Sequence, residues 1–93
     1  MELGVFSLSD IYPGSPDTAA SRTWDIIDYG VLAERHGLDV YGVGEHHTRA
    51  CAVSSPAVIH AAIAQATSRI TLTTTSTILP VLDPVRLYQD FAT

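Results

Sequence analysis

The stretch Asp39–His47, D-V-Y-G-V-G-E-H-H, is a short apolar segment that ends abruptly in a carboxylate and two imidazoles. Its pattern predicts a β-strand from Val40 to Gly44. In parallel α/β folds, the side chains that carry chemistry collect at the C-terminal ends of strands. We therefore expect the functional site at Glu45–His47 and regard the rest of the chain as its scaffold.

Two further strands are predicted on either side of this segment. Leu3–Leu8 is an apolar run typical of a strand buried on both faces of a parallel sheet. Ile70–Leu79 is rich in β-branched residues and is ended by Pro80. Helices are expected between and after the strands, and their start and stop signals are Thr18 or Asp17 and Gly37 for the first, Ser55-Pro56 for the second and Asp83-Pro84 for the third.

The order β-α-β-α-β-α predicts an α/β fold made of three βα units. If every crossover curls the same way, the helices cover one face of a parallel sheet, as in a TIM-type (β/α)₈ barrel of about 250 residues. A doubly wound sheet would instead have helices on both faces. The third helix has no stop signal before the sequence ends, which favours three units of an incomplete TIM-type barrel.

Helical periodicity also predicts which side of each helix is buried. Each of the three helices carries apolar residues at spacings of three and four. The predicted buried stripes are Ala20, Trp24, Ile27 and Val31 in the first helix, Ile59, Ala62, Ile63 and Ala66 in the second, and Val85, Tyr88, Phe91 and Ala92 in the third.

Composition excludes several classes of function. The 93 residues carry a net charge of −5 and only five basic side chains, which argues against a nucleic-acid partner and a membrane-surface helix. No apolar run approaches the roughly 20 residues of a membrane span, and the N-terminus lacks the features of a signal peptide. The single Cys51 forms no internal disulfide and fits a reducing compartment. We expect a cytoplasmic protein.

Alternation along a strand divides the E-H-H side chains between two faces. His46 shares a face with Gly42 and Gly44, whereas Glu45 and His47 share the other face. The glycines would leave a hollow in which a flat ligand could lie beside an imidazole that titrates near neutrality. The alternative is that these residues are simply solvated at a strand end.

A metal site is not predicted. The three side chains of Glu45–His47 cannot converge on one ion from a straight strand, and His36 and His60 fall on predicted helices without a ligand spacing. Cys51 lies in a loop with no oriented base indicated by the spacing, so we interpret it as an ordinary thiol.

Five consecutive hydroxyl residues, Thr73–Thr77, interrupt the third apolar strand. Threonine standing in for valine would explain them by β-propensity alone. In a barrel, however, half of these hydroxyls would face the interior and need partners, which a polar ring system or a phosphate-bearing ligand could supply. The chain has no glycine-rich phosphate loop, and Pro13 and Pro16 remove amides that a flavodoxin-like loop after the first strand would use.

Three segments together carry a resemblance to a known family. They are G-L-D-V-Y-G-V-G-E-H-H at 37–47, S-P-A-V-I-H-A-A-I-A-Q-A-T-S-R-I-T-L at 55–72 and L-P-V-L-D-P-V-R-L-Y-Q-D-F-A-T at 79–93. In this order and spacing the chain resembles the N-terminal part of the bacterial-luciferase-like flavin-dependent monooxygenases. The resemblance implies that residues 1–93 form a single partial luciferase-like barrel domain, the first three βα units.

The resemblance also implies a cofactor and site residues. Members of the family use reduced FMN, or in one branch a deazaflavin coenzyme, and flavin users typically add one oxygen atom of O₂ to a small organic substrate. His46 would be the catalytic histidine near the flavin ring, helping proton transfer and stabilising the peroxy intermediate, with Gly44, Thr75 and Ser76 also binding the cofactor. The Thr75–Ser76 bond matches a place where the family often has a non-proline cis peptide. Glu45 and His47 would be supporting or interface groups.

Two functional hypotheses lead from the sequence, ahead of a small flavodoxin-like ligand binder. One is a flavin-dependent oxidoreductase represented by an N-terminal fragment that is inactive alone, because the loops expected to bind the flavin phosphate come later in the barrel. The other is a non-catalytic module that forms homo-oligomers through its open strand edges.

Overall fold

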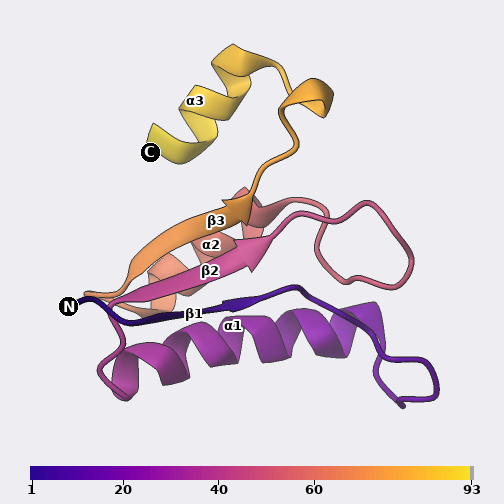
Figure 1. Ribbon diagram of the computed structural model, residues 1–93, viewed down its shortest axis with the longest axis horizontal. Coiled ribbons are helices and arrows are strands. Elements are labelled where there is room, and N and C mark those ends of the chain that lie inside the picture. Colours follow the sequence, from indigo (N-terminus) through magenta and orange to yellow (C-terminus); the bar gives the residue numbers. More distant parts are fainter. Residues whose placement is uncertain (93) are drawn as a thin grey trace.

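The computed structural model describes residues 1–92 and has three parallel strands alternating with helices (Figure 1). The predicted α/β architecture is confirmed. The elements are β1 (Gly4–Ser7), α1 (Ala19–Arg35), β2 (Val40–Gly44), α2 (Pro56–Ala66), β3 (Thr71–Ser76), a 3₁₀ turn η1 (Leu79–Val81) and α3 (Pro84–Ala92).

The strand β2 lies at the centre of the sheet, in the order β1-β2-β3. Its bounds are those predicted from the sequence. Parallel pairing sets Gly4 opposite Val40 on one side and Val40 opposite Thr71 on the other, so all three strands end at the same edge of the sheet. The E-H-H segment therefore emerges between two neighbouring strand ends.

Both α1 and α2 pack on one face of this sheet. Tyr41 and Val43 of β2 are buried with Ile26 of α1 and Ile63 of α2 in a single core. The opposite face, which carries Gly42, is covered by no helix among the described residues (Figure 1). This one-sided arrangement is that of a barrel wall and differs from a doubly wound sheet.

The outer strands differ from their predictions. We expected Leu3–Leu8 to be buried on both faces, but β1 is an edge strand whose Val5 and Phe6 side chains are 47% and 57% exposed. It pairs only with β2 among the described residues, so half of its backbone and much of its apolar surface are uncovered. The third strand is shorter than Ile70–Leu79 because the chain turns into η1 after Ser76.

The buried faces of the helices also differ from the predicted stripes. In α1 the buried residues are Ile26, Gly30 and Ala33, whereas Trp24 is 68% exposed. The space that a Cβ on Gly30 would occupy is filled by Ile63, with Cγ2 at 2.7 Å. The contact face is thus selected by close helix–helix approach at a glycine rather than by the largest apolar side chains.

The second and third helices also depart from their predicted stripes. In α2, Ile63 is buried as expected, but the other buried residues are Pro56 and His60, and Ala62 and Ala66 are exposed. None of the predicted α3 stripe is buried, and α3 lies apart from the sheet beyond β3 (Figure 1). Its described ring contact is between Phe91 and His60, with centroids 6.4 Å apart.

Local signals set the helix ends. Thr18 is the N-cap of α1 and forms a capping box with Ser21 in both directions. At α2, Ser55 occupies the N-cap position but makes no side-chain cap bond, and Pro56 begins the helix. None of the described helices is long and apolar enough to cross a membrane.

The Glu34 carboxylate binds backbone amides at the edge of the sheet opposite to the E-H-H segment. Glu34, near the end of α1, accepts backbone hydrogen bonds from Ser68, Arg69 and Ile70 at 2.7–3.1 Å. These amides, with that of Ile70 first, hold the pKa of the Glu34 carboxyl below its ordinary value. The N-terminal edge of the strands in a barrel carries structural contacts rather than the active site, so we interpret the role of Glu34 as structural.

We expect Glu34→Gln to lower the free energy of unfolding at pH 7, because a glutamine has one acceptor oxygen and carries no charge. A depressed pKa in the folded state means that the stabilisation is present above the unfolded-state pKa of about 4.3 and is lost as the pH falls through the folded-state value. The difference between wild type and variant in urea unfolding should therefore shrink below about pH 4.3. Asp28→Asn, an exposed carboxylate on the same helix, is the control; a difference independent of pH would contradict this role of Glu34.

Candidate functional site

The structure brings the four predicted site residues together at the C-terminal edge of β2 and β3. Gly44 lies opposite Ser76, and Thr75 is the extra residue where the register shifts between Val43 and Gly44. The position that a Cβ on Gly44 would occupy lies 3.1 Å from His46 Nε2 and 3.4 Å from Thr75 Oγ1. The imidazole and the hydroxyl thus converge over the glycine, on the face that none of the described helices covers.

The predicted hollow above the glycines is not present. At Gly42 the space of a Cβ is occupied by Thr75 Cγ2 at 2.7 Å and by Phe6 Cβ at 3.0 Å. At Gly44 the His46 ring fills it. The glycines therefore let neighbouring side chains lie flat against the strand, and any ligand would rest on these side chains instead of on bare backbone.

Glu45 and His47 are paired on the opposite face, as strand alternation predicted. Glu45 Oε1 and His47 Nε2 are 2.6 Å apart, and Glu45 Oε2 accepts a 3.0 Å bond from the backbone amide of Ile78. Burial of Glu45, which is 4% exposed, acts to raise the pKa of its carboxyl, but the bonds from His47 and Ile78 outweigh burial and leave the pKa below its ordinary value.

The His46 side chain has a ring nitrogen without a hydrogen-bond partner. Its backbone amide donates to the carbonyl of Val53 at 3.0 Å, which fixes the residue, while Nε2 is buried without a hydrogen-bond partner. A buried polar atom without a partner costs free energy unless a ligand or water satisfies it. This nitrogen and the Thr75 hydroxyl are the polar groups that lie over Gly44 on the face away from α1 and α2.

The implied cis peptide is not found. All peptide bonds within residues 1–92 are trans, including Thr75–Ser76. The irregularity at this place is a shift in register, in which Thr75 is accommodated as an additional residue of β3 opposite the junction of Val43 and Gly44. The cis peptide implied by the resemblance at this bond is therefore wrong for this structure.

The loop after β1 contacts the loop that follows the E-H-H segment, and sequence reasoning missed this contact. Ser9 is fully buried with φ of 65°, its carbonyl accepts from the Ala52 amide at 2.8 Å, and its hydroxyl is buried without a partner. The next residue, Asp10, bridges to Cys51, whose Sγ lies 3.6 Å from Asp10 Oδ1. Only turn-forming residues marked this loop in the sequence, and nothing there signalled burial.

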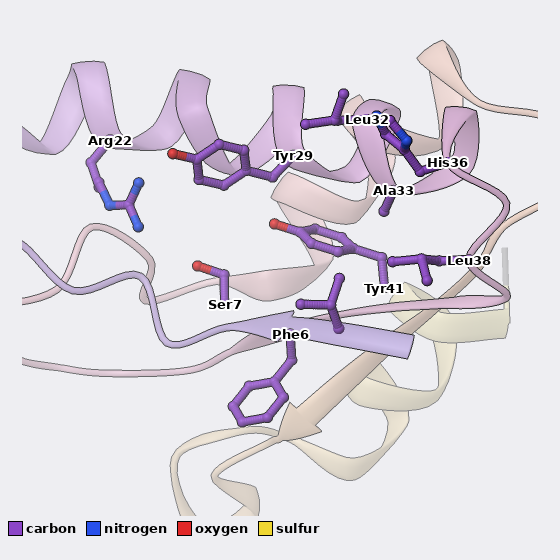
Figure 2. A pocket seen from close by; sticks show the side chains of 10 residues that line it. Phe6, Ser7, Arg22, Tyr29, Leu32, Ala33, His36, Leu38 and Tyr41 are labelled. Atoms are coloured by element: carbon purple, nitrogen blue, oxygen red, sulfur yellow. The ribbon is translucent and has the colours of Figure 1, made fainter. Parts of the chain in front are cut away.

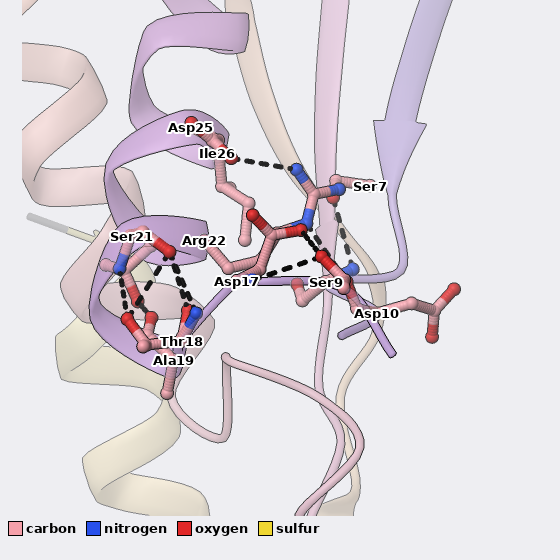
Figure 3. Close-up of polar contacts among 12 residues, drawn as sticks. Ser7, Ser9, Asp10, Asp17, Thr18, Ala19, Ser21, Arg22, Asp25 and Ile26 are labelled. Carbon is pink, nitrogen blue, oxygen red and sulfur yellow. Dashed lines mark hydrogen bonds and ion pairs between the residues drawn. The ribbon is translucent and has the colours of Figure 1, made fainter. Parts of the chain in front are cut away.

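Arg22 of α1 holds the same loop from the helix side. Its Nε donates to the carbonyl of Asp10 at 3.0 Å, and Nη1 pairs with Asp25 at 3.4 Å (Figure 3). The guanidinium also lies 5.6 Å from the centre of the Tyr29 ring. The loops after β1 and β2 are therefore tied to each other and to α1.

A groove of about 360 Å³ runs between β1 and α1, on the helix side of the sheet (Figure 2). Its lining is mainly apolar and includes Val5, Leu32 and Tyr41. The Tyr41 hydroxyl is committed to the Ile26 carbonyl at 3.0 Å, and burial raises its pKa to about 12. The groove is thus mainly apolar, although Arg22 and His36 also line it, and the Tyr41 hydroxyl is already bound within the protein.

Residues 1–92 contain no group of three or more histidine, cysteine, aspartate or glutamate side chains that could hold a metal ion. His60, which is buried between α2 and β3, has its pKa lowered by burial, and its Nε2 lacks a partner. The structure thus leaves His36 and His60 away from the E-H-H segment.

The geometry defines an α/β barrel wall with a polar strand-end site, and sequence comparison names its family. The family model of the luciferase-like monooxygenases matches the sequence over residues 1–93, and the chain belongs to that family. No curated protein sequence matches it significantly.

Solved structures with the same fold agree with this assignment. The apo form of MsnO8 superimposes with a TM-score of 0.87 at 28% identity over 97% of this chain. A second similar structure is the FMN complex of a type II Baeyer-Villiger monooxygenase, the oxygenating constituent of 3,6-diketocamphane monooxygenase from the CAM plasmid of Pseudomonas putida. It superimposes with a TM-score of 0.86 at 25% identity over 97% of this chain. Monooxygenase RslO1 from Streptomyces bottropensis superimposes with a TM-score of 0.86 at 21% identity over 99% of this chain, which shows a likeness of fold. This chain spans 27%, 24% and 28% of those chains, respectively.

Proposed function

We propose that this chain supplies the ring-side part of a flavin site in a luciferase-like monooxygenase, with His46 as its catalytic histidine. The observation that carries the proposal is the convergence of His46 Nε2 and Thr75 Oγ1 over Gly44, with the imidazole nitrogen buried and unpartnered. Residues 1–93 would form one partial barrel domain, and further βα units would complete the site and bind the flavin phosphate.

The proposed cofactor is reduced FMN, with a deazaflavin coenzyme as the alternative. One similar structure is an FMN complex, which supports FMN for this family member. The flavin would supply the electrons for reaction of O₂ with a small organic substrate. His46 would hold or move a proton at Nε2, and Thr75 and Ser76 would offer hydroxyl groups to the polar edge of the ring system.

The proposed role of Glu45 and His47 is to support this arrangement. Because their side chains satisfy each other on the helix side of the sheet, they do not compete with His46 for a ligand on the other side. His46 is thus the imidazole of this segment that remains uncommitted.

A second proposal concerns association of chains. The edge strand β1 exposes its unpaired side and the adjoining apolar groove, which favours pairing with another strand. A homo-oligomer formed through such edges would be consistent with either a working site or a non-catalytic assembly module. We also propose a cytoplasmic location.

The test is a titration of the 93-residue chain with oxidised and reduced FMN, followed by flavin fluorescence and sedimentation. We expect saturable binding by the wild type and about three- to tenfold weaker binding by His46→Ala, the effect of losing one hydrogen bond. His36→Ala, an exposed histidine at the end of α1, should bind like the wild type. Association into dimers without any flavin binding would instead favour the assembly module.

A further inference from the structure

We propose that Glu45 is a positioning residue that fixes the end of β3 against His46. The proposal rests on the proposed function, because the side chains it aligns are those assigned to the flavin ring. Nothing in the alternation of strand residues predicts this role, since it depends on a contact across 33 positions of sequence.

The two oxygens of Glu45 bind two different segments. Oε1 lies 2.6 Å from His47 Nε2, and Oε2 accepts from the Ile78 amide at 3.0 Å. Ile78 follows Ser76 by two residues, so this bond is made just beyond the end of β3. One carboxylate therefore sets how far the Thr75–Ser76 segment lies from the end of β2.

The same turn has a second bond that transmits the restraint into β3. Thr77 Oγ1 donates to Thr74 Oγ1 at 2.9 Å, so the residues that flank Thr75 and Ser76 are held to each other. On the other side of the site, the His46 amide is bound to the Val53 carbonyl. Movement at Ile78 is therefore expected to reach Thr75 and Ser76, while His46 stays with its own loop.

The surroundings favour a charged carboxylate at this position. Glu45 lines a cavity of about 40 Å³ together with Ser54, Ser55, Pro56 and Ala57, at the start of α2. Free amides at a helix N-terminus and the helix dipole favour negative charge, and Ser55 does not cap these amides with its side chain. Burial of the carboxylate is thus compensated by the two hydrogen bonds from His47 and Ile78, and the start of α2 and Asp90 line the same cavity.

Glutamine and alanine at position 45 separate the contribution of the hydrogen bond to Ile78 from that of the hydrogen bond to His47. Glutamine keeps one acceptor for the Ile78 amide, and its NH₂ can donate to His47 Nε2 only if the imidazole proton moves to Nδ1. Glu45→Gln should therefore retain the spacing and change the His47 tautomer. Glu45→Ala removes both bonds and should release the end of β3.

The test compares these variants with Glu34→Gln, which removes a carboxylate restraint at the opposite edge of the sheet. In nitrogen-15 NMR of the full chain, Glu45→Ala should speed hydrogen exchange of the Ile78 amide about tenfold and shift the Thr75 and Ser76 signals. Glu45→Gln should keep those signals close to wild type and show the Nδ1–H tautomer of His47. Glu34→Gln should leave them unchanged.

Binding of FMN gives the functional readout. Glu45→Ala should raise the FMN dissociation constant about tenfold, with recovery towards wild type in Glu45→Gln. Unchanged Thr75 and Ser76 signals in Glu45→Ala, or equal effects in Glu34→Gln, would overturn the positioning role. If Glu45→Ala does not fold, the folded Glu45→Gln variant serves as the test. Loss of its hydrogen bond to the Ile78 amide without any change in the Thr75 NMR signal would also overturn the positioning role. Wild-type protein that binds no FMN would contradict the proposed function, and the NMR comparison would still decide the role of Glu45.

Discussion

Ile63→Ala should lower the free energy of unfolding by about 2–5 kcal/mol, the range for truncating a fully buried isoleucine. Ile63 has no exposed surface and stands where α2 meets α1 and β2. Its Cγ2 and Cδ1 atoms fill the space beside Gly30, so their removal leaves a gap lined by a glycine that has no side chain to collapse into it. The expected loss is large because a domain of this size has about 5–15 kcal/mol in total.

Urea unfolding followed by circular dichroism measures this loss, and Val58→Ala is the matched control. Val58 lies on the exposed side of the same helix, with 65% of its surface accessible, and its truncation should change the free energy of unfolding by about 0.5 kcal/mol or less. A loss below 1 kcal/mol for Ile63→Ala would show that the contact between α1 and α2 contributes little to the fold.

Much of the central unit could be predicted from the sequence. The bounds of β2 follow from an apolar run between Gly37 and the E-H-H segment, and the division of Glu45 and His47 from His46 follows from the two-residue period of a strand. These features depend on neighbours in sequence, which is why pattern reasoning recovered them. The placement of Thr75 beside His46 followed only from the family resemblance.

The outer parts of the fold could not be predicted because they depend on what each element meets in space. Burial of Trp24 was expected from periodicity, but the close approach at Gly30 turns another side of α1 towards the sheet. The Leu3–Leu8 run has the composition of a central strand, and its position at an edge leaves it exposed. The stripes predicted from periodicity in α1 and α2 were therefore assigned in part to the wrong side of the helix, whereas no side of α3 is buried.

The candidate site shows the same limit. The sequence identified the residue types, yet the Glu45–Ile78 bond and the burial of Ser9 are long-range contacts with no local signal. The glycines were expected to create a hollow, but in the structure they accommodate the side chains of His46 and Thr75. A site built between strand ends thus needs the register of the sheet, which one strand alone does not determine.

Gly30→Ala should also destabilise the protein, although alanine is the better helix former. The gain in helix propensity is about 1 kcal/mol, whereas overpacking a closed interior costs about 1–3 kcal/mol. The new Cβ would lie 2.7 Å from Ile63 Cγ2 and 3.2 Å from Tyr41 Cδ1, both buried atoms on side chains with little freedom to move. We expect the clash to outweigh the propensity gain, giving a net loss of up to about 2 kcal/mol.

The double variant Gly30→Ala/Ile63→Ala distinguishes a clash from a loss of backbone freedom. Alanine at position 63 removes the Cγ2 and Cδ1 atoms that the new methyl group meets, so the methyl should then fill part of the cavity. The double variant should be more stable than the sum of the two single losses predicts, by about 0.5–3 kcal/mol of coupling in urea unfolding. Strict additivity would mean that Gly30 is required for its backbone and not for the contact with Ile63. Favourable coupling would show that Gly30 and Ile63 act through the contact between α1 and α2.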